Sequence, residues 1–252
     1  MSRSNLPRVL NLGCGHKTSP HPDVLNVDWS IFLRFRKSRL LRSLPLALLR
    51  GARRQRYVAI PDNTLAHDVA RPLPFPDASI DIVYHSHMLE HIARDQVTRF
   101  LHEVYRVLRP GGVHRVVVPD LEVLARRYLE HVGECGRNQH ERARHEEYVA
   151  ELIEQCVREI PAGAAALSGW RRRLYLALCG NARTKGEVHR WMYDSVTLTQ
   201  ILTAAGFAEV EVQACDRSRI EDWKVYGLDL NENGTAHKAD SLYIECVRPR
   251  AG

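Results

Sequence analysis

The sequence predicts an α/β fold built on a mostly parallel sheet. Short apolar runs alternate along the chain with stretches whose apolar residues recur at helical spacing. Strands that alternate with helices form right-handed βαβ units, and these units place successive strands parallel. The 252 residues are 44% hydrophobic and 26% charged, which is close to the average of globular proteins. Collagen-like, fully disordered and small disulfide-framework proteins are therefore excluded.

Seven segments have the character of strands. The predicted strands are 8–12, 24–28, 64–69, 79–84, 113–118, 209–213 and 241–247. Between them, 95–108 has apolar residues at helical spacing, with Asp95 as N-cap and Arg109-Pro-Gly-Gly112 as the stop signal. A further helix is expected after Pro119-Asp120, and a short one over 195–205 before Gly206.

We expect one domain over 1–252 that carries two insertions. The first is a basic segment over 30–56. The second, over 131–188, is helical and highly charged and has no strand signal, so we interpret it as a cap inserted into the fold.

The formal net charge is +6, and much of the surplus lies in the basic segment. Between Ser30 and Arg56 there are nine cations and no acid, alternating with apolar residues. Two interpretations stay open. The segment is either a helical flap whose apolar face packs on the core, or a surface that binds an anionic membrane or acceptor.

Nothing in the sequence predicts secretion or membrane insertion. No window holds the roughly 18 apolar residues that span a bilayer, and the N-terminus has no apolar leader. The six cysteines are scattered, with no CxxC pair and no Cys/His cluster at zinc spacing, which favours reduced thiols in a cytoplasm. We expect a protein free in the cytoplasm or bound peripherally at the inner face of the membrane.

A glycine turn follows the first strand, and a carboxylate ends the second. Gly13 and Gly15 allow positive φ and close approach of a ligand, while Asp28 is placed to accept hydrogen bonds from a ribose. A dinucleotide would need a third glycine and a helix N-terminus. Thr18 stands at that glycine position, and only 13 residues separate Gly15 from Asp28. S-adenosylmethionine makes no such demand.

Five motifs occur in one order along the chain. They are Val9-Leu-Asn-Leu-Gly-Cys-Gly15, Val27-Asp28, Asp68-Val-Ala-Arg-Pro-Leu-Pro-Phe-Pro-Asp-Ala-Ser-Ile-Asp81, His87-Met-Leu-Glu-His91 and Val107-Leu-Arg-Pro-Gly-Gly112. Together they resemble the class I S-adenosylmethionine-dependent methyltransferases, most closely the type 11 group, over about 8–120. His189-Arg-Trp-Met-Tyr-Asp194, with Ala204-Ala-Gly-Phe207, resembles a bacterial branch associated with glycans.

The resemblance implies a Rossmann-like sheet of about seven strands with an antiparallel last strand and helices on both faces. It implies transfer of a methyl group from S-adenosylmethionine to oxygen or nitrogen of a small-molecule, glycan or lipid-linked acceptor. The cofactor-binding residues carried over by position are Leu12, Gly13, Cys14, Gly15, Asp28, Trp29, Asp68, Val69, His85 and Ser86. Asp28 would hold the ribose, and Trp29 would pack on the adenine. Asp68 would accept a hydrogen bond from the adenine amino group. Packing in the core for Trp29 and an N-cap role for Asp68 are the alternatives.

A base is needed only if the acceptor is a hydroxyl. Imidazole has a suitable pKa, and His87 and His189 are the predicted catalytic residues. Trp191 and Tyr193 would wall the acceptor site, and Asp194 is either part of it or the cap of the next helix. A metal held by His87, Glu90 and His91 is an alternative, but three such residues meet easily by chance, so we assign no metal ligand.

Two other functions compete with this prediction. The net charge permits a nucleic-acid methyltransferase, but Tyr84-His-Ser-His87 does not resemble the Asn/Asp-Pro-Pro-Tyr motif that holds a flipped base. Nucleic acid is therefore disfavoured as a partner. A non-catalytic, cofactor-binding scaffold at a membrane is the second competitor.

Overall fold

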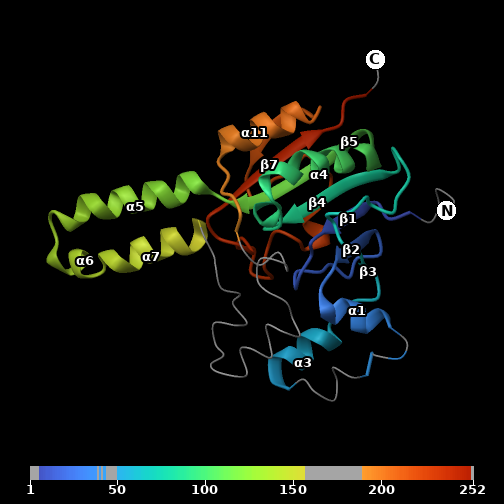
Figure 1. Cartoon of the computed structure of the whole chain (residues 1–252), viewed down its shortest axis with the longest axis horizontal. Helices are drawn as coiled ribbons and strands as arrows, with labels where there is room; N and C mark the ends of the chain where they lie inside the picture. The colour runs from blue at the N-terminus through green and yellow to red at the C-terminus, as the bar shows by residue number, and fades with distance from the viewer. Residues whose placement is uncertain (1–5, 39, 41, 44–49, 157–188, 251–252) are drawn as a thin grey trace.

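A seven-stranded sheet forms the centre of the computed structural model, which describes residues 6–38, 40, 42–43, 50–156 and 189–250 (Figure 1). The strands are β1 Val9–Leu12, β2 Val24–Asp28, β3 Thr64–Ala66, β4 Ile80–Ser86, β5 Leu108–Pro119, β6 Ala208–Gln213 and β7 Ser241–Val247. Their order is β3-β2-β1-β4-β5-β7-β6. Strands β1 to β5 pair parallel, whereas β7 runs antiparallel to both of its neighbours. The predicted sheet, with its antiparallel last strand, is confirmed.

One face of the sheet is covered by α4 (Arg94–Val107) and α11 (Ser195–Ala204) (Figure 1). Helix α4 buries residues at helical spacing, among them Phe100 and Val104, in the main core cluster. The predicted cap is wrong by two residues, because Ala93 is the N-cap and Asp95 lies in the first turn. An acid in that turn still stabilises the helix through its dipole. Helix α11 has the predicted cap, since Asp194 and Thr197 form a capping box.

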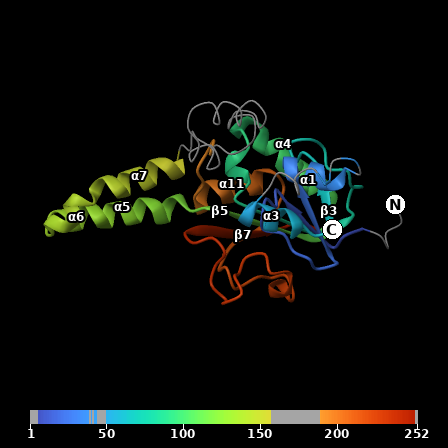
Figure 2. The same cartoon turned by 90° about the horizontal axis from the view of Figure 1, so that it is seen from below.

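The other face is covered by residues 214–240, a mostly irregular segment that contains the short 3-10 helix η3 (Trp223–Tyr226) (Figure 2). A second apolar cluster joins the two layers, with Trp223 and Leu228 from the segment against Tyr84 and Tyr243 of the sheet. Aromatic packing here takes the place of a long helix.

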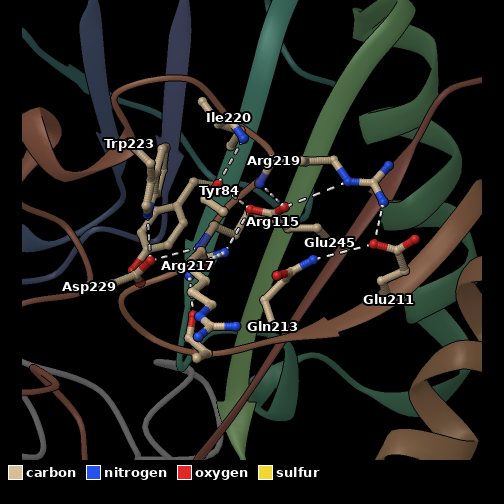
Figure 3. A network of polar contacts seen from close by, with 12 residues as sticks. Tyr84, Arg115, Glu211, Gln213, Arg217, Arg219, Ile220, Trp223, Asp229 and Glu245 are labelled. Carbon is tan, nitrogen blue, oxygen red and sulfur yellow. Dashed lines mark hydrogen bonds and ion pairs between the residues drawn. The ribbon is translucent and has the colours of Figure 1, made fainter.

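A buried guanidinium ties this segment to the sheet. Arg115 of β5 is fully buried and donates from Nε to Asp229 Oδ2 at 2.7 Å and from Nη1 to Glu245 Oε1 at 2.6 Å (Figure 3). Its remaining donors reach the carbonyl oxygens of Arg217 and Ala214. A buried charge is tolerated only when it is paired and its hydrogen bonds are satisfied, and Arg115 meets both conditions.

The two carboxylates of this network are also shared with other groups. Asp229 accepts from Tyr84 Oη at 2.8 Å and from Trp223 Nε1 at 2.6 Å. Glu245 accepts from the Ser218 hydroxyl and from the Arg219 backbone N–H. Each end of the 214–230 stretch is therefore bound to the sheet through Arg115.

The basic segment contains α1 (Ile31–Lys37) and α3 (Gly51–Val58), while residues 39, 41 and 44–49 lie outside the described residues. Ser30 caps α1 through the N–H of Leu33. Leu33 and Tyr57 are buried, and the Phe32 and Tyr57 rings meet edge to face. Leu33 thus packs inward as the flap interpretation expects, whereas Leu40 is 93% exposed, and membrane binding stays a prediction. Over the described ranges, the structure has no helix with the length and apolar character to cross a bilayer.

A helical hairpin, which includes the described first part of the predicted cap (131–156), projects away from the sheet in both views (Figures 1 and 2). It consists of α5 (Leu121–Cys135), α6 (Gln139–Ala143) and α7 (His145–Cys156). Asp120 caps α5, as expected. The rest of the predicted cap, 157–188, lies outside the described residues.

Replacing Arg115 by Met should lower the free energy of unfolding by about 3–5 kcal/mol, because Asp229 and Glu245 would stay buried without a counter-charge. Urea unfolding measures this loss. Arg126→Met is the matched control, since Arg126 forms an exposed i,i+4 pair with Glu122 and its loss should change stability by only about 0.5 kcal/mol. Equal losses in the two variants would contradict this role of Arg115.

Candidate functional site

The carboxyl ends of β1 to β4 meet at one edge of the sheet. Leu12 is paired with Val27 on one side and with His85 on the other, and Asp28 is paired with Ala66. Ligands of open α/β sheets bind outside this edge. The turn after β1 and the residues after β2, β3 and β4 therefore lie together, as the sequence predicted.

Gly13 and Gly15 both have positive φ, +62° and +51°, but they face different surroundings. A Cβ on Gly13 would lie 2.4 Å from Cγ of Met88, so this glycine lets the Met88 side chain pack against the turn. Gly15 has nothing within 4 Å of that position. The open side of the turn is thus at Gly15, where a ligand can approach the backbone.

Buried amides, rather than a helix, hold the connection from β1 to β2. Asn11 Nδ2 donates to the Lys17 carbonyl and to Asn26 Oδ1, both at 2.9 Å. Asn26 in turn accepts from the Ser19 N–H and donates to its carbonyl. Two asparagines inside buried strands signalled this network in the sequence, but neither was recognised there as a site-building residue.

Asp28 binds the turn directly. Its Oδ2 accepts from the Gly15 N–H at 2.8 Å, and its Oδ1 accepts from the Ser30 N–H at 2.6 Å. Each oxygen keeps a further lone pair, and the half-buried carboxylate can still accept from two ribose hydroxyls. The residues present therefore fit the sugar of a nucleoside cofactor.

The neighbours of Asp28 are divided between exposed and buried groups. Trp29 is 49% exposed, with the Arg34 guanidinium 4.6 Å from its ring centroid, so it does not pack in the core. Cys14 is buried, and burial together with the charge of Asp28 raises the pKa of its thiol. Leu12 is fully buried in the main core cluster and offers only its backbone to the edge.

Asp68 and Val69 follow β3. Asp68 Oδ1 accepts from the Ala70 N–H, and Oδ2 lies 3.6 Å from Arg71 Nε. The carboxylate closes a turn and caps no helix, so the alternative interpretation is wrong. Val69 packs against the main core cluster, which leaves its backbone beside Asp68.

His85 is placed differently from the prediction. Its side chain is fully buried, packs against Phe100 and His114, and has no hydrogen-bond partner among the described residues. Burial lowers the pKa of His85 to about 3 and keeps the ring neutral. Because alternate residues of a strand face opposite sides, this side chain faces α4 and only its backbone lies at the edge. Ser86, the next residue, is half-buried there.

The chain then turns sharply at His87, whose φ is +50°. Its Nε2 lies 2.8 Å from the Ser241 hydroxyl, and its Nδ1 lies 3.5 Å from Oε1 of the fully buried Glu90. Burial, with nearby cationic groups, lowers the pKa of His87 to about 3. Burial also raises the pKa of Glu90 to about 8. Both side chains are therefore neutral near pH 7, which avoids a buried charge.

The second predicted base comes to the same place from far along the chain. His189 is buried, and its ring centroid lies 4.9 Å from that of His91. The backbone N–H groups of Arg190 and Trp191 donate to the Glu90 carbonyl, which fixes this segment across the site. His87 and His189 thus meet around Glu90.

The predicted aromatic walls are arranged otherwise than expected. Tyr193 is 2% exposed and belongs to the core, where the Leu121 N–H donates to its carbonyl. Trp191 is 40% exposed, and the Arg94 guanidinium lies 3.9 Å from its ring centroid. Only Trp191 offers a surface toward solvent.

One set of groups here has the spacing of metal ligands. The ligand atoms of Glu90, His91 and His189 all lie within 4.8 Å of one another. Both Glu90 oxygens lack a hydrogen-bond partner among the described residues, although His87 and His91 are within 4 Å. A divalent cation would satisfy them. Neutral Glu90 beside imidazoles satisfies the same geometry without an ion, so we assign no metal here.

Residues 45–116 match the family model described as a methyltransferase domain. This segment includes β3, β4, α4 and the first part of β5, and it leaves out the turn after β1. A curated protein of Mycolicibacterium smegmatis, described as "Probable S-adenosylmethionine-dependent methyltransferase", is 43% identical over 67 residues. That stretch is 27% of this chain and 24% of the relative, so the chain matches about a quarter of that protein's length.

Structure comparison matches the chain to the S-adenosylmethionine-dependent methyltransferase SibL, at 16% sequence identity and a TM-score of 0.45. The match covers 98% of this chain and 52% of SibL. Another is phosphoethanolamine N-methyltransferase 2 of Haemonchus contortus in complex with S-adenosyl-L-methionine, at 14% identity and a TM-score of 0.41, over 97% and 49%. The family match and the curated relative support the predicted enzyme class and cofactor.

Replacing Glu90 by Gln should stabilise the protein more at pH 8 than at pH 5. The pKa of Glu90 is about 8 in the folded protein against an ordinary value of 4.5, so between these values the folded state binds more protons than the unfolded state. Wild-type stability therefore falls as pH rises through this window, and the neutral amide removes that loss. Urea unfolding at both pH values measures the difference, which should grow by at least ~1 kcal/mol.

Glu134→Gln on the exposed face of α5 is the control, and its effect should be the same at both pH values. A Glu90→Gln effect that does not change with pH would show that this carboxyl has an ordinary pKa.

Proposed function

We propose that the protein transfers a methyl group from S-adenosylmethionine to oxygen or nitrogen of a small-molecule or glycan-like acceptor. The observation that carries this proposal is the Asp28 carboxylate, which ends β2 and accepts from the Gly15 N–H at the open side of the turn. The matched family model and the curated relative support the same chemistry. Each of these matches covers under a third of the chain, so the activity of the whole protein is a proposal.

The donor half of the proposed site is built from backbone and one acid. Gly13 and Gly15 shape the turn, and Asp28 would accept the ribose hydroxyls through its remaining lone pairs. Trp29 offers an exposed aromatic face beside this carboxylate, and Asp68 at the end of β3 would accept from the adenine amino group. When bound, S-adenosylmethionine supplies a methyl group on a positively charged sulfur that leaves as a neutral thioether.

Alignment of donor and acceptor can contribute several kcal/mol to such a displacement. A hydroxyl acceptor must also lose a proton, and His87 and His189 are the proposed proton acceptors near the end of β4. With a pKa of about 3, His87 is a weak base, which favours a positioning role for it. A neutral amine acceptor would need neither.

The acceptor itself is proposed only by class. The basic segment 30–56 begins directly after Asp28 and Trp29, so an anionic or lipid-linked acceptor would meet cations beside the donor site. Arg34 and Arg36 lie on α1, and Lys37 ends it.

S-adenosylhomocysteine should raise the melting temperature of the wild-type protein, because a ligand that binds only the folded state stabilises it. NAD should not. Asp28→Asn should weaken S-adenosylhomocysteine binding about tenfold or more, since it removes charge-assisted hydrogen bonds to the sugar. Shifts are compared with each variant's own melting temperature without ligand, and Asp216→Asn, on an exposed residue, is the control. An unchanged affinity in Asp28→Asn would contradict the proposed donor site.

His189→Ala should lower turnover about 10²–10⁴-fold with a hydroxyl acceptor, while S-adenosylhomocysteine binds as before. His87→Ala should lower it less. Labelled S-adenosylmethionine with fractions of cell extract identifies the acceptor and measures turnover. His102→Ala, on the exposed face of α4, should have no effect. Unchanged turnover in the double variant would remove both histidines from the mechanism, and binding without any methylated product would favour a non-catalytic scaffold.

A further inference from the structure

Three groups that bind metals converge near the far end of the helical hairpin. Cys135 Sγ lies 3.3 Å from His131 Nε2 and 3.9 Å from His145 Nδ1. All three atoms lie within 4.8 Å of one another. The sequence showed no Cys/His cluster at zinc spacing, but folding brings the end of α5 against the start of α7.

The spacing suits a tetrahedral ion. With Zn–S near 2.3 Å and Zn–N near 2.0–2.1 Å, ligand atoms on one zinc ion lie about 3.3–3.6 Å apart. His131 and Cys135 are four residues apart on α5 and therefore share one face of the helix. His145 is the first residue of α7 and closes the set from the other helix.

A carboxylate supports the first imidazole from behind. Glu141 Oε2 lies 3.5 Å from His131 Nδ1, the ring nitrogen that faces away from Cys135. Metal-bound histidines commonly donate their second N–H to such a carboxylate, which fixes the tautomer and orients the ring. The Tyr148 ring, stacked on His131 at 3.7 Å, holds the same orientation.

Burial contributes little at the far end of the hairpin among its described residues. Among its described residues only Leu124 and His131 are buried, and α6 buries none. Two short helices without an apolar core are marginal in water. A histidine at 4% exposure is an unusual centre for such a pair unless it makes a stronger bond.

We propose that His131, Cys135 and His145 bind one zinc ion that fastens α5 to α7, with Glu141 as the supporting carboxylate. Zinc is bound in proteins by thiolates and imidazoles, whereas magnesium and calcium take oxygen ligands. On binding, the Cys135 thiol releases its proton to solvent and the sulfur bonds to the ion. Three protein ligands leave a fourth position for water. This site is separate from Glu90, His91 and His189, and the proposed methyl transfer does not depend on it.

Cobalt(II) is the probe, because a cobalt–thiolate bond gives a near-ultraviolet charge-transfer band that imidazole and carboxylate ligands do not. The full-length protein, freed of metal with a chelator, is titrated with Co²⁺ and then with Zn²⁺. We expect the band to saturate at about one equivalent and to disappear when zinc displaces cobalt. No band in the wild-type protein would overturn the proposal.

Variants assign the band to this cluster. Cys135→Ser should abolish it, whereas Cys215→Ser, at another partly exposed free cysteine, should keep it. His189→Ala should also keep it, which separates this site from the one around Glu90. Glu141→Gln should keep the band but weaken zinc binding about 10–100-fold. A band that persists in Cys135→Ser would place the thiolate elsewhere and overturn the proposal.

Thermal unfolding gives an independent measurement. Zinc should raise the melting temperature of the wild-type and Cys215→Ser proteins and leave that of Cys135→Ser unchanged. Circular dichroism of the metal-free variants shows whether each is folded, and His145→Gln serves in place of Cys135→Ser if that variant is not. Equal zinc shifts in the wild-type protein and a folded ligand variant would overturn the proposal.

Discussion

The buried guanidinium of Arg115 is the interaction on which the arrangement of the site depends. It joins β5 to Asp229 and to Glu245 of β7, and so fixes the irregular segment that covers one face of the sheet (Figure 3). Directly after Asp229, the Leu230 carbonyl accepts from the Lys17 ammonium in the connection after β1. The same segment leads into Ser241, whose hydroxyl meets His87. The donor turn and the acceptor side are therefore both braced by a segment that Arg115 holds in place.

Buried polar groups hold two connecting segments in place where the fold has no long helix to do so. Asn11 and Asn26, inside two central strands, hold a connection that has no helix of its own. Asp229 and Glu245 do the same for the 214–240 segment. A satisfied polar network in the interior specifies one geometry, because each lost hydrogen bond leaves a costly unpaired group. This rigidity suits a site that acts by aligning two reactants.

Two polar clusters lie outside that network, one around Glu90 and one at Cys135, and they differ in the ligand or reaction that they suit. Around Glu90, burial without a strong counter-charge favours neutral forms of the carboxyl and of His87. At the hairpin, a thiol and two imidazoles converge from two helices, and a carboxylate stands behind one of them. The first arrangement suits the movement of a proton, and the second suits a bound cation.

The sequence by itself determined where most strands lie, the glycine turn, Asp28 at the end of β2 and the stop of α4, because these depend on local periodicity, turn chemistry and the parallel order of βαβ units. Strand bounds were less well predicted, since β5 begins at Leu108, five residues before the predicted 113–118, and β3 ends at Ala66. The sequence also indicated His87 and His189 as candidate bases from the pKa of imidazole and their predicted places on loops. Only the tertiary structure decided that His85 faces α4, that Met88 fills the space beside Gly13, and that Ser241 meets His87. The same is true of the cluster at Cys135. Such contacts join residues far apart in the chain or set which side of a strand a group faces, and local pattern carries no information about either until the layers pack.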